Sequence, residues 1–298
     1  MFDMLEAMRS AGLEVKHLNL DGEIHRVPTV SKPNSLNGWY TAINNELIVF
    51  GDWESNTKTV LSSRATPYSP EIQFKITREI ELKKQEIRRK QHNAAIDAQQ
   101  IYKQSLKVDK HPYLDAKGLV PYPNILCSAG KLAIPVFELS KEQARIGNLQ
   151  LIDYKGHKRF LPGGRIKGFC YSYGLSNVDS CRAIYVCEGV ATALSLHMNN
   201  RNIAVAAALT ANNLDSVTKT IVSLFPSTQV IIAGDDDWLT EQKTGKNPGK
   251  HAAIEAAMKY NVNVSFPPFD ASDKKLGLTD WNDYYLTVSG SREHVRTD

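Results

Sequence analysis

The residues with the clearest capacity for chemistry are carboxylates that follow short apolar runs. Glu188 comes directly after one such run, and Asp235, Asp236 and Asp237 follow another after a single glycine. Three adjacent carboxylates repel one another unless a cation neutralises their charge. Because Asp235 and Asp237 are two residues apart, both can point to the same side and supply the oxygen ligands that Mg²⁺ and Mn²⁺ prefer. Together the motifs predict a divalent-cation site, although either one alone could be a helix N-cap or a surface turn.

Basic residues and glycines near these acids in the sequence offer contacts for anions. One group flanks the turn Pro162-Gly163-Gly164, where glycine lets a phosphate approach the backbone; a charged surface hairpin is the alternative. A second group lies around 246–250, where a predicted helix begins and its first amides favour an anion. The candidate substrate-binding and nucleic-acid-binding residues are Lys158, Arg159, Arg165, Lys167, Lys246, Lys250, Gly189 and Gly249.

The elements that must hold these residues form a regular pattern in the second half of the chain. Continuous apolar runs, typical of buried strands, alternate with segments of helical character. The expected strands are 183–187, 203–207, 229–233 and 262–266, and the expected helices are 188–200, 214–225 and 249–260. This alternation predicts a parallel sheet covered by helices on both faces. In such sheets functional groups collect at the carboxyl ends of the strands, where Glu188 and Asp235 stand.

The beginning of the chain is expected to form a small unit of short strands over residues 1–68. A helix at 4–12 opens it, and the dipeptides Asn37-Gly38 and Asn44-Asn45 predict tight turns. The cluster TPYSP at 66–70 indicates a boundary. The aromatic residues of this unit either form its core or stack on single-stranded bases; they are Trp39, Tyr40 and Trp53.

Two segments connect this unit to the parallel sheet. Residues 71–106 contain no Gly and no Pro and are markedly basic, which predicts a long helix. A solvated surface helix is favoured over a helix that contacts phosphates or acts as a lever between domains. Residues 107–180 have the composition of short strands bounded by turns, which predicts a strand-rich region.

The composition narrows the class of protein. The 298 residues include 36 Lys and Arg against 32 Asp and Glu, a formal net charge of +4 that is weak evidence for nucleic acid. Hydrophobic residues at 42% exclude wholesale disorder. No apolar run approaches the roughly 18 residues that cross a membrane, and the polar N-terminus is unlike a secretory signal. The four cysteines contain no CxxC pair, so no zinc is expected.

Three stretches resemble the Toprim domain that bacterial-type primases, topoisomerases and some nucleases share. They are IYVCEGVATALSLH, QVIIAGDDD and NPGKHAAIEAA, and the resemblance covers roughly residues 182–285. Further stretches resemble the primases of plasmids, satellite phages and other mobile elements. These are NGWY, FGDW, HPYLDAKGL, GNLQLIDYKGHKRFLPGG and TDWNDYY.

The resemblance assigns roles to individual residues. Glu188 falls on the family glutamate, which acts as a general acid or base or joins in metal coordination. Asp235 and Asp237 fall on the metal ligands of the DxD motif. The family's G-x-x-A-A segment falls on Gly249, Ala252 and Ala253. The signature near the end of the domain falls on Asp280, Asn282 and Asp283, with Trp281 in place of a more usual Phe, and it implies Asp283 as an additional metal ligand.

The implied fold class is α/β, with a Toprim parallel sheet flanked by helices, a strand-rich α+β subdomain before it and a small N-terminal domain. The expected domains are 1–68 without zinc ligands, a basic helical linker at 69–106, a strand-rich primase core at 107–180 and the Toprim catalytic domain at 181–298. The zinc module usual at the start of such primases is missing from 1–68.

The implied function is that of a nucleotidyltransferase. It is a DNA primase that makes short RNA primers on single-stranded DNA for replication of a phage or plasmid in the cytoplasm of a bacterial host. The implied ligands are NTPs and Mg²⁺ or Mn²⁺, as two ions. Because no Walker A motif is present, a separate helicase is expected, and no membrane partner. A Toprim nuclease and a non-catalytic nucleic-acid-binding scaffold remain alternatives; a topoisomerase is disfavoured by the short chain.

Overall fold

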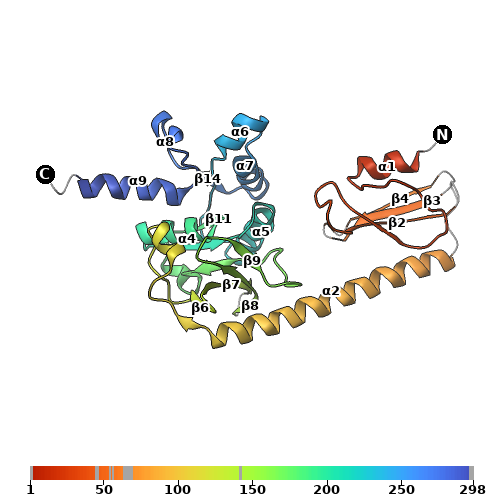
Figure 1. Cartoon of the computed structure of the whole chain (residues 1–298), viewed down its shortest axis with the longest axis horizontal. Coiled ribbons are helices and arrows are strands. Elements are labelled where there is room, and N and C mark those ends of the chain that lie inside the picture. Colours follow the sequence, from red (N-terminus) through yellow and green to blue (C-terminus); the bar gives the residue numbers. More distant parts are fainter. Residues whose placement is uncertain are drawn as a thin grey trace. The chain divides into compact units, whose positions relative to one another are not determined.

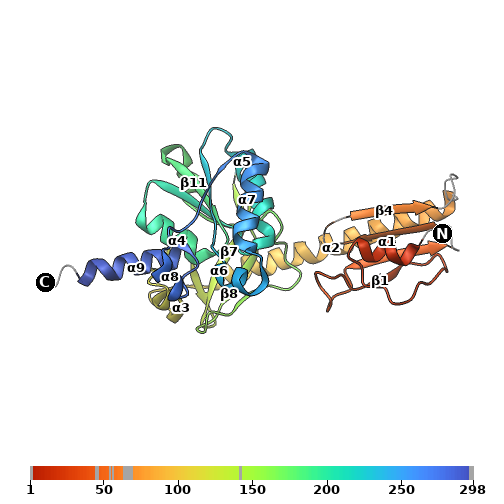
Figure 2. The same ribbon diagram turned by 90° about the horizontal axis from the view of Figure 1, so that it is seen from above.

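The computed structural model describes residues 3–43, 47–53, 55, 57–62, 70–140 and 143–294. The chain divides into two compact units, residues 1–86 and 87–298, which Figures 1 and 2 draw from two directions. The turn predicted at Asn44-Asn45 and most of the boundary predicted at 66–70 lie outside the described residues. The finer division at residues 68, 106 and 180 stays a prediction.

The first unit is built on an antiparallel sheet with the strand order β1-β2-β3-β4. Its elements are α1 (Met4–Ser10), β1 (His25–Val27), β2 (Gly38–Ile43), β3 (Leu47–Asp52) and β4 (Thr57–Ser62). The helix begins at Asp3, whose carboxylate accepts from the amides of Leu5 and Glu6 at 3.0 and 3.1 Å.

The aromatic side chains of this unit are core residues. Trp39 and Tyr40 are 1% and 2% exposed, and the ring of Trp53 stacks on Trp39 at 5.2 Å. Burial this deep leaves Trp39 and Tyr40 no face for a nucleic-acid base. The tight turn predicted at Asn37-Gly38 is wrong, because Gly38 begins β2 and pairs with Val27 and Asp52. A Cβ at Gly38 would lie 3.0 Å from the carbonyl oxygen of Val27, so close strand approach explains the glycine.

Helix α2 (Pro70–Gln104) confirms the long helix predicted at 71–106. Within the second unit it packs through alanines, since Ala94 and Ala98 are 5% and 0% exposed. Ala98 shares a cluster with Ala133 and Leu149 of the next sheet. The small side chains let the helix lie close to that sheet, while Arg88, Arg89 and neighbouring polar residues remain outside the core.

The strand-rich region forms a second antiparallel sheet with the order β5-β6-β7-β8-β9. Its strands are β5 (Leu106–Lys107), β6 (Leu126–Ser128), β7 (Lys131–Leu139), β8 (Ala144–Ile152) and β9 (Lys158–Phe160). The short helix α3 (Pro112–Ala116) begins at His111, whose Nδ1 accepts from the amide of Tyr113 at 3.2 Å. These elements bring Tyr113 and Lys158 toward the third sheet.

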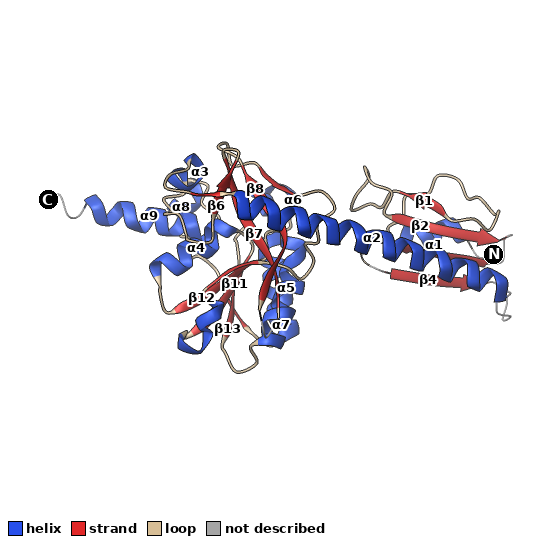
Figure 3. Cartoon of the chain, turned by 90° about the horizontal axis from the view of Figure 1, so that it is seen from below, coloured by secondary structure: helices blue, strands red, loops and turns tan. Residues whose placement is uncertain are grey.

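The third sheet has the order β10-β12-β11-β13-β14. Its strands are β10 (Tyr171–Tyr173), β11 (Ala183–Cys187), β12 (Ile203–Ala207), β13 (Val230–Ala233) and β14 (Asn263–Ser265). The last four run parallel, as the sequence predicts, and β10 adds an antiparallel edge that the pattern did not indicate. Figure 3 shows helices on either side of these strands.

The helices of this region are α4 (Val190–Asn199), α5 (Leu214–Leu224), α6 (Trp238–Thr244), α7 (Pro248–Tyr260), α8 (Ala271–Lys275) and α9 (Trp281–His294). Alternate residues of the strands point to opposite faces of the sheet and belong to two hydrophobic cores. One core contains residues of α4, and the other contains residues of α5 and α7. Cys187, Val205 and Ala207 belong to the first core, which continues into the second sheet. Ile184, Val186 and Ala206 belong to the second. Both faces are therefore covered, which confirms the α/β fold class.

Among the described residues no helix combines the length and apolarity needed to cross a membrane.

Candidate functional site

The register of the parallel strands places the two acidic motifs at one edge of the sheet. Cys187 at the end of β11 pairs with Ala233 at the end of β13, so Glu188 and Asp235 leave the sheet side by side. Gly234 is needed between β13 and Asp235, because a Cβ there would clash with the ring of Phe266 and lie 2.8 Å from the Cβ of Ala253. The Asp-rich turn therefore packs closely against α7 and against Phe266, the residue after β14.

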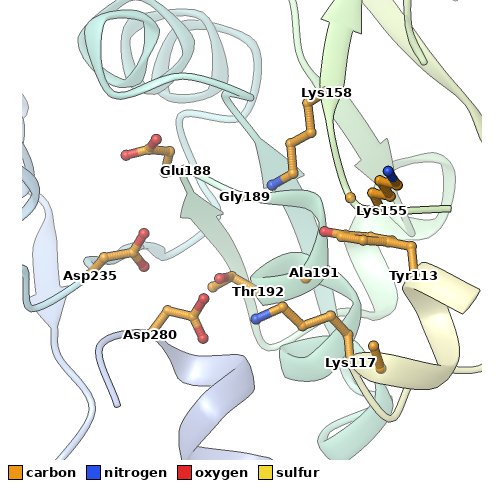
Figure 4. A pocket seen from close by; sticks show the side chains of 12 residues that line it. Tyr113, Lys117, Lys155, Lys158, Glu188, Gly189, Ala191, Thr192, Asp235 and Asp280 are labelled. Atoms are coloured by element: carbon orange, nitrogen blue, oxygen red, sulfur yellow. The ribbon is translucent and has the colours of Figure 1, made fainter. Parts of the chain in front are cut away.

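These acids open onto a cavity of about 430 Å³. Figure 4 shows carboxylates on one side of it and lysines with a tyrosine on the other. The acids are Glu188, Asp235 and Asp280, and the facing residues are Tyr113, Lys117, Lys155 and Lys158. Gly189, Ala191 and Thr192 from the start of α4 lie between the two groups. The cavity thus has a negative and a positive side.

Burial and crowding of the acids raise their pKa values. Burial raises the pKa of Asp235 well above its ordinary range. The negative charges of Asp280, Glu188 and Asp237 raise it further. Burial also raises the pKa of Glu188 and of Asp280. A cation bound among these groups would relieve both the burial of charge and the mutual repulsion.

The lysines oppose the acids across the cavity. The pKa of Lys158 is lowered by partial burial of its ammonium group and by the positive charge of Lys117, although part of the side chain remains exposed. Glu188 and the other acids act in the opposite direction. Lys117 also lies 3.5 Å from Asp283. Two ammonium groups that face one cavity form a favourable place for an anion.

The three aspartates of the turn point to different partners. Asp235 faces the cavity (Figure 4), with its Oδ1 shielded from solvent and without a hydrogen-bond partner in the described structure. Asp236 points away from the cavity. Its Oδ1 accepts from Nδ2 of Asn247 at 2.8 Å, and its Oδ2 lies 3.6 Å from Nζ of Lys274. Asp237 is near enough to raise the pKa of Glu188 and Asp235 but does not line the cavity.

The start of α7 does not offer the free amides that the sequence suggested. The amide of Gly249 donates to Oδ2 of Asp237 at 2.8 Å, and the amide of Lys250 donates to Oδ1 of Asn247 at 3.1 Å. A Cβ at Gly249 would lie 2.7 Å from Oδ2 of Asp237, which explains the glycine. The expectation of an anion on these amides is corrected, since they hold the aspartate in place. A role for Gly249 in substrate binding stays a prediction.

Asp280, rather than the expected ligand Asp283, reaches the cavity. Oδ2 of Asp283 accepts from the amides of Thr279 and Asp280 at 3.0 and 3.4 Å, and its Oδ1 faces Lys117. Asn282 is 1% exposed and donates to the carbonyl of Lys117 at 2.8 Å. The end of the domain therefore supplies Asp280 to the cavity and uses Asp283 and Asn282 to orient it and Lys117. Metal ligation by Asp283 stays a prediction.

Lys158 and Gly189 are the predicted substrate-binding residues that line the cavity. Arg159 is the next residue on β9 and is exposed. The guanidinium of Arg165 lies 4.6 Å from the ring centroid of Phe169, and its Nε donates to the carbonyl of Lys167. Lys246 is exposed, and Nζ of Lys250 lies 5.4 Å from the ring centroid of Phe266. For the residues outside the cavity, including Lys167, nucleic-acid contact stays a prediction.

Sequence reasoning missed several cavity residues on the positive side. Tyr113 and Lys117 belong to α3 and the turn after it, and Lys155 belongs to the turn before β9. The stretch HPYLDAKGL contains the first two, and its resemblance to the mobile-element primases was the one available signal. The local sequence pattern did not indicate that α3 would reach the third sheet.

The donor set suits a hard divalent cation. The residues facing the cavity are carboxylates, and the buried, unpartnered Oδ1 of Asp235 is the kind of atom that a cation satisfies. Among the described residues no three His, Cys, Asp or Glu side chains converge closely enough to form a finished metal site. The acids therefore fit Mg²⁺ or Mn²⁺ by chemistry and charge, and they line the same cavity without forming a closed ligand set.

Comparison with known proteins agrees with the motifs. Residues 183–291 match the family model of the Toprim domain. Two proteins named DNA primase TraC, both from Escherichia coli, are each 29% identical to the chain over 292 and 290 residues. The alignments cover 90% of this chain but only 19% and 26% of those relatives, so the chain spans about a quarter of their length or less. The resemblance to Toprim-domain DNA primases is confirmed.

Solved structures give weaker matches. The primase fragment of the bacteriophage T7 primase-helicase protein matches with a TM-score of 0.39 at 15% identity, covering 62% of this chain and 68% of that one. The DnaG primase catalytic domain bound to ssDNA matches with a TM-score of 0.37 at 15% identity, covering 61% and 74%. At these scores neither match carries an argument about function.

Proposed function

We propose that the chain is the catalytic part of a DNA primase that makes short RNA primers on single-stranded DNA from NTPs. The observation that carries the proposal is the two-sided cavity, in which Glu188, Asp235 and Asp280 face Lys117 and Lys158. Joining nucleotides requires a place for divalent cations beside a place for a triphosphate, and the cavity provides both kinds of side chain. The similarity to the TraC primases supports the same activity.

The acids are proposed to hold Mg²⁺ or Mn²⁺, as two ions, through Asp235, Asp237 and Glu188, with Asp280 beside them. When bound, such ions neutralise phosphate charge and favour ionisation of the attacking hydroxyl. Glu188 has a second suitable property. When no cation is bound directly to it, its pKa is raised by burial and by Asp237, and a carboxyl group with a raised pKa is better matched to proton exchange near neutral pH. We assign it the proton of the primer 3′-hydroxyl.

The lysines are proposed to bind the triphosphate of the incoming nucleotide. Lys158 comes from β9, and Lys117 comes from the turn after α3, where Asn282 holds its carbonyl. Ammonium groups on two separate elements can contact different phosphates and leave the α-phosphate toward the acids. This division of roles fits synthesis better than hydrolysis, because cleavage of a nucleic-acid strand needs no triphosphate subsite.

The template and the partners follow from the same proposal. The exposed basic residues Arg159, Lys167 and Lys246 are proposed to contact the single-stranded DNA. A separate helicase is proposed to supply that strand during replication of a phage or plasmid, in the cytoplasm of a bacterial host.

One reaction distinguishes synthesis from cleavage. End-labelled single-stranded DNA is mixed with ribonucleotides carrying a second label, with Mg²⁺ or Mn²⁺, and both labels are followed on one gel. The proposal predicts short ribonucleotide products and intact template. Products must be absent with EDTA and absent from the D235A/D237A double variant. Shortened template without new products would instead establish the nuclease, and binding with neither reaction would establish a non-catalytic scaffold.

A further inference from the structure

The hydroxyl of Tyr113 is a buried donor without a partner. The side chain is 7% exposed, and its hydroxyl oxygen has no hydrogen-bond partner within the described structure. Buried hydroxyl groups are nearly always hydrogen-bonded, because an unpartnered one loses its contact with water and receives nothing in return. A phenylalanine would fill the same space without this loss. The hydroxyl therefore calls for a partner from outside the chain.

The position of the ring is fixed by its surroundings. Tyr113 lies in α3 and belongs to the core that α4 and the second sheet share. On another side, a Cβ added to Gly156 would already touch the ring at 3.4 Å. Nζ of Lys158 lies 5.8 Å from the ring centroid. A ring held on several sides presents its hydroxyl in one direction, which Figure 4 shows to be into the cavity, between Lys158 and Lys117.

The charges around the hydroxyl indicate what kind of atom it meets. Burial and the negative charge of Asp280 raise the pKa of Tyr113 to about 12, so the phenol keeps its proton and donates it at any physiological pH. Its neighbours in the cavity on this side are the ammonium groups of Lys117 and Lys158. Cations and a neutral donor that point to the same space attract an acceptor with negative charge. Phosphate oxygens fit this requirement better than the hydroxyl groups of a sugar, which carry no charge to attract the two ammonium groups.

We propose that Tyr113 donates a hydrogen bond to a phosphate oxygen of the incoming nucleoside triphosphate, beside the two lysines. The inference rests on the proposed function, because it names a residue of the same cavity. The Tyr113 hydroxyl adds a neutral and rigid donor to the two lysines. A rigid donor fixes the position of the phosphate chain, whereas the mobile ammonium groups of the lysines recognise only its charge.

Tyr113→Phe tests the proposal, because it removes one oxygen and leaves the ring. Binding of ATP and of inorganic tripolyphosphate, each with Mg²⁺, is measured by calorimetry, and the melting temperature is measured without ligand. We expect Y113F to weaken both ligands by roughly tenfold, the usual effect of losing one hydrogen bond to a charged group. The melting temperature should stay the same or rise, because an unpartnered buried hydroxyl has been removed.

A matched control reverses this pattern. The hydroxyl of Tyr102 donates to the carbonyl of Asn124 at 2.8 Å, away from the cavity, so Tyr102→Phe should lower the melting temperature and leave both affinities unchanged. If Y113F behaved like Y102F, the inference would be overturned. Weaker binding of ATP with unchanged binding of tripolyphosphate would overturn the phosphate assignment in favour of the sugar or base. If the unmodified chain bound neither ligand, the proposed function itself would fail, and this inference with it.

Discussion

Asn247 holds Asp236 by a hydrogen bond of 2.8 Å from Nδ2 to Oδ1, and its Oδ1 holds the backbone amide of the next aspartate, Asp237. Its Nδ2 also donates to Glu241, and its Oδ1 accepts from the amides of Asp237 and Lys250 at 3.1 Å each. Asp236 is 6% exposed, and its own amide donates to the carbonyl of Thr279 at 2.8 Å. The turn that carries Asp235 and Asp237 is thus tied to α7 and to the loop that carries Asp280.

Asn247→Ala should therefore affect cations as well as stability. We expect the free energy of unfolding to fall by about 1–3 kcal/mol, because Asp236 loses a buried partner. We also expect the Mg²⁺ concentration for half-maximal priming to rise severalfold, because Asp237 loses the contact that fixes its amide. Both are measurable by chemical denaturation and by a metal titration.

Asn124→Ala is the matched control for this variant. Asn124 also makes hydrogen bonds through both ends of its amide, to Ser172 and Tyr171, but it lies outside the cavity. Its loss should lower stability to a similar degree and leave the Mg²⁺ requirement alone. An unchanged Mg²⁺ requirement in both variants would show that Asn247 is structural only.

The acid side of the cavity should destabilise the chain when no cation is present. Because the pKa of Asp235 in the folded state is raised above its unfolded value of about 3.9, protonation favours the folded state. This contribution is fully present below the unfolded pKa and is lost as the pH rises through the folded pKa. Asp235→Asn, which cannot ionise, should thus melt at the same temperature as the unmodified chain near pH 4 and a few degrees higher at pH 8.

Adding Mg²⁺ should reduce the difference in melting temperature between the two proteins at pH 8. Only the unmodified chain has the Asp235 carboxylate, so a cation that binds there stabilises it more than the variant. Differential scanning calorimetry at the two pH values, with Mg²⁺ and with EDTA, checks both parts. If Asp235→Asn were the less stable protein at pH 8 in EDTA, the assignment of buried, mutually repelling carboxylates would be incorrect.

Asp280 and Asp283 should differ sharply in their effect on catalysis. Asp280 lines the cavity, and its Oδ1 also accepts from the amide of Asp283 at 2.8 Å. Asp283 is not among the cavity residues; it accepts from the amides of Thr279 and Asp280 and faces Lys117. Asp280→Asn should lower priming by about 10²-fold or more, a typical loss for one electrostatic group at a reacting centre. Asp283→Asn keeps an oxygen that can accept from the amides, so we expect less than a tenfold loss. The reverse order of the two losses would restore Asp283 as the metal ligand that the motif implied.

Neighbouring residues on β9 provide the test of the positive side. Lys158 lines the cavity, and Arg159, one residue further, does not. Lys158→Met should raise KM for nucleotides by about tenfold, because a charge-assisted contact with the triphosphate is lost. Arg159→Met should leave that KM within about twofold. Steady-state kinetics over a nucleotide titration separates them, and equal effects would argue against a triphosphate at Lys158.

Periodic apolar strands explain why much of the fold could be predicted. Residues 183–187 and 203–207 are β11 and β12 to the residue, because buried parallel strands are continuous apolar runs that end where polarity begins. Gly38 misled the prediction because a glycine that lets two strands approach looks the same in sequence as a glycine in a turn. The antiparallel edge strand β10 is three residues long and carries too short a pattern to be seen.

The acidic side of the cavity could be predicted from the sequence, whereas most of the positive side could not. Glu188 and Asp235 sit at strand ends, so local sequence and sheet topology together place them at one edge. Lys117 and Tyr113 enter from α3, more than seventy positions before Glu188, and only tertiary packing of that helix against α4 and α9 brings them there. Asp280 and Asp283 have different roles because of the hydrogen bonds within one turn, and their spacing of three residues does not reveal which of them reaches the cavity.

In the proposed function, the acids of this cavity catalyse primer synthesis. The most direct measurement is the initial rate of ribonucleotide incorporation on circular single-stranded DNA without any primer, for the unmodified chain and for E188Q, D235N and D280N. The variants are first matched for folding by circular dichroism and for DNA binding by anisotropy. We expect short products from the unmodified chain and at least about 10²-fold less product from each variant, with DNA binding retained. Equal synthesis by all four proteins would contradict the proposed function.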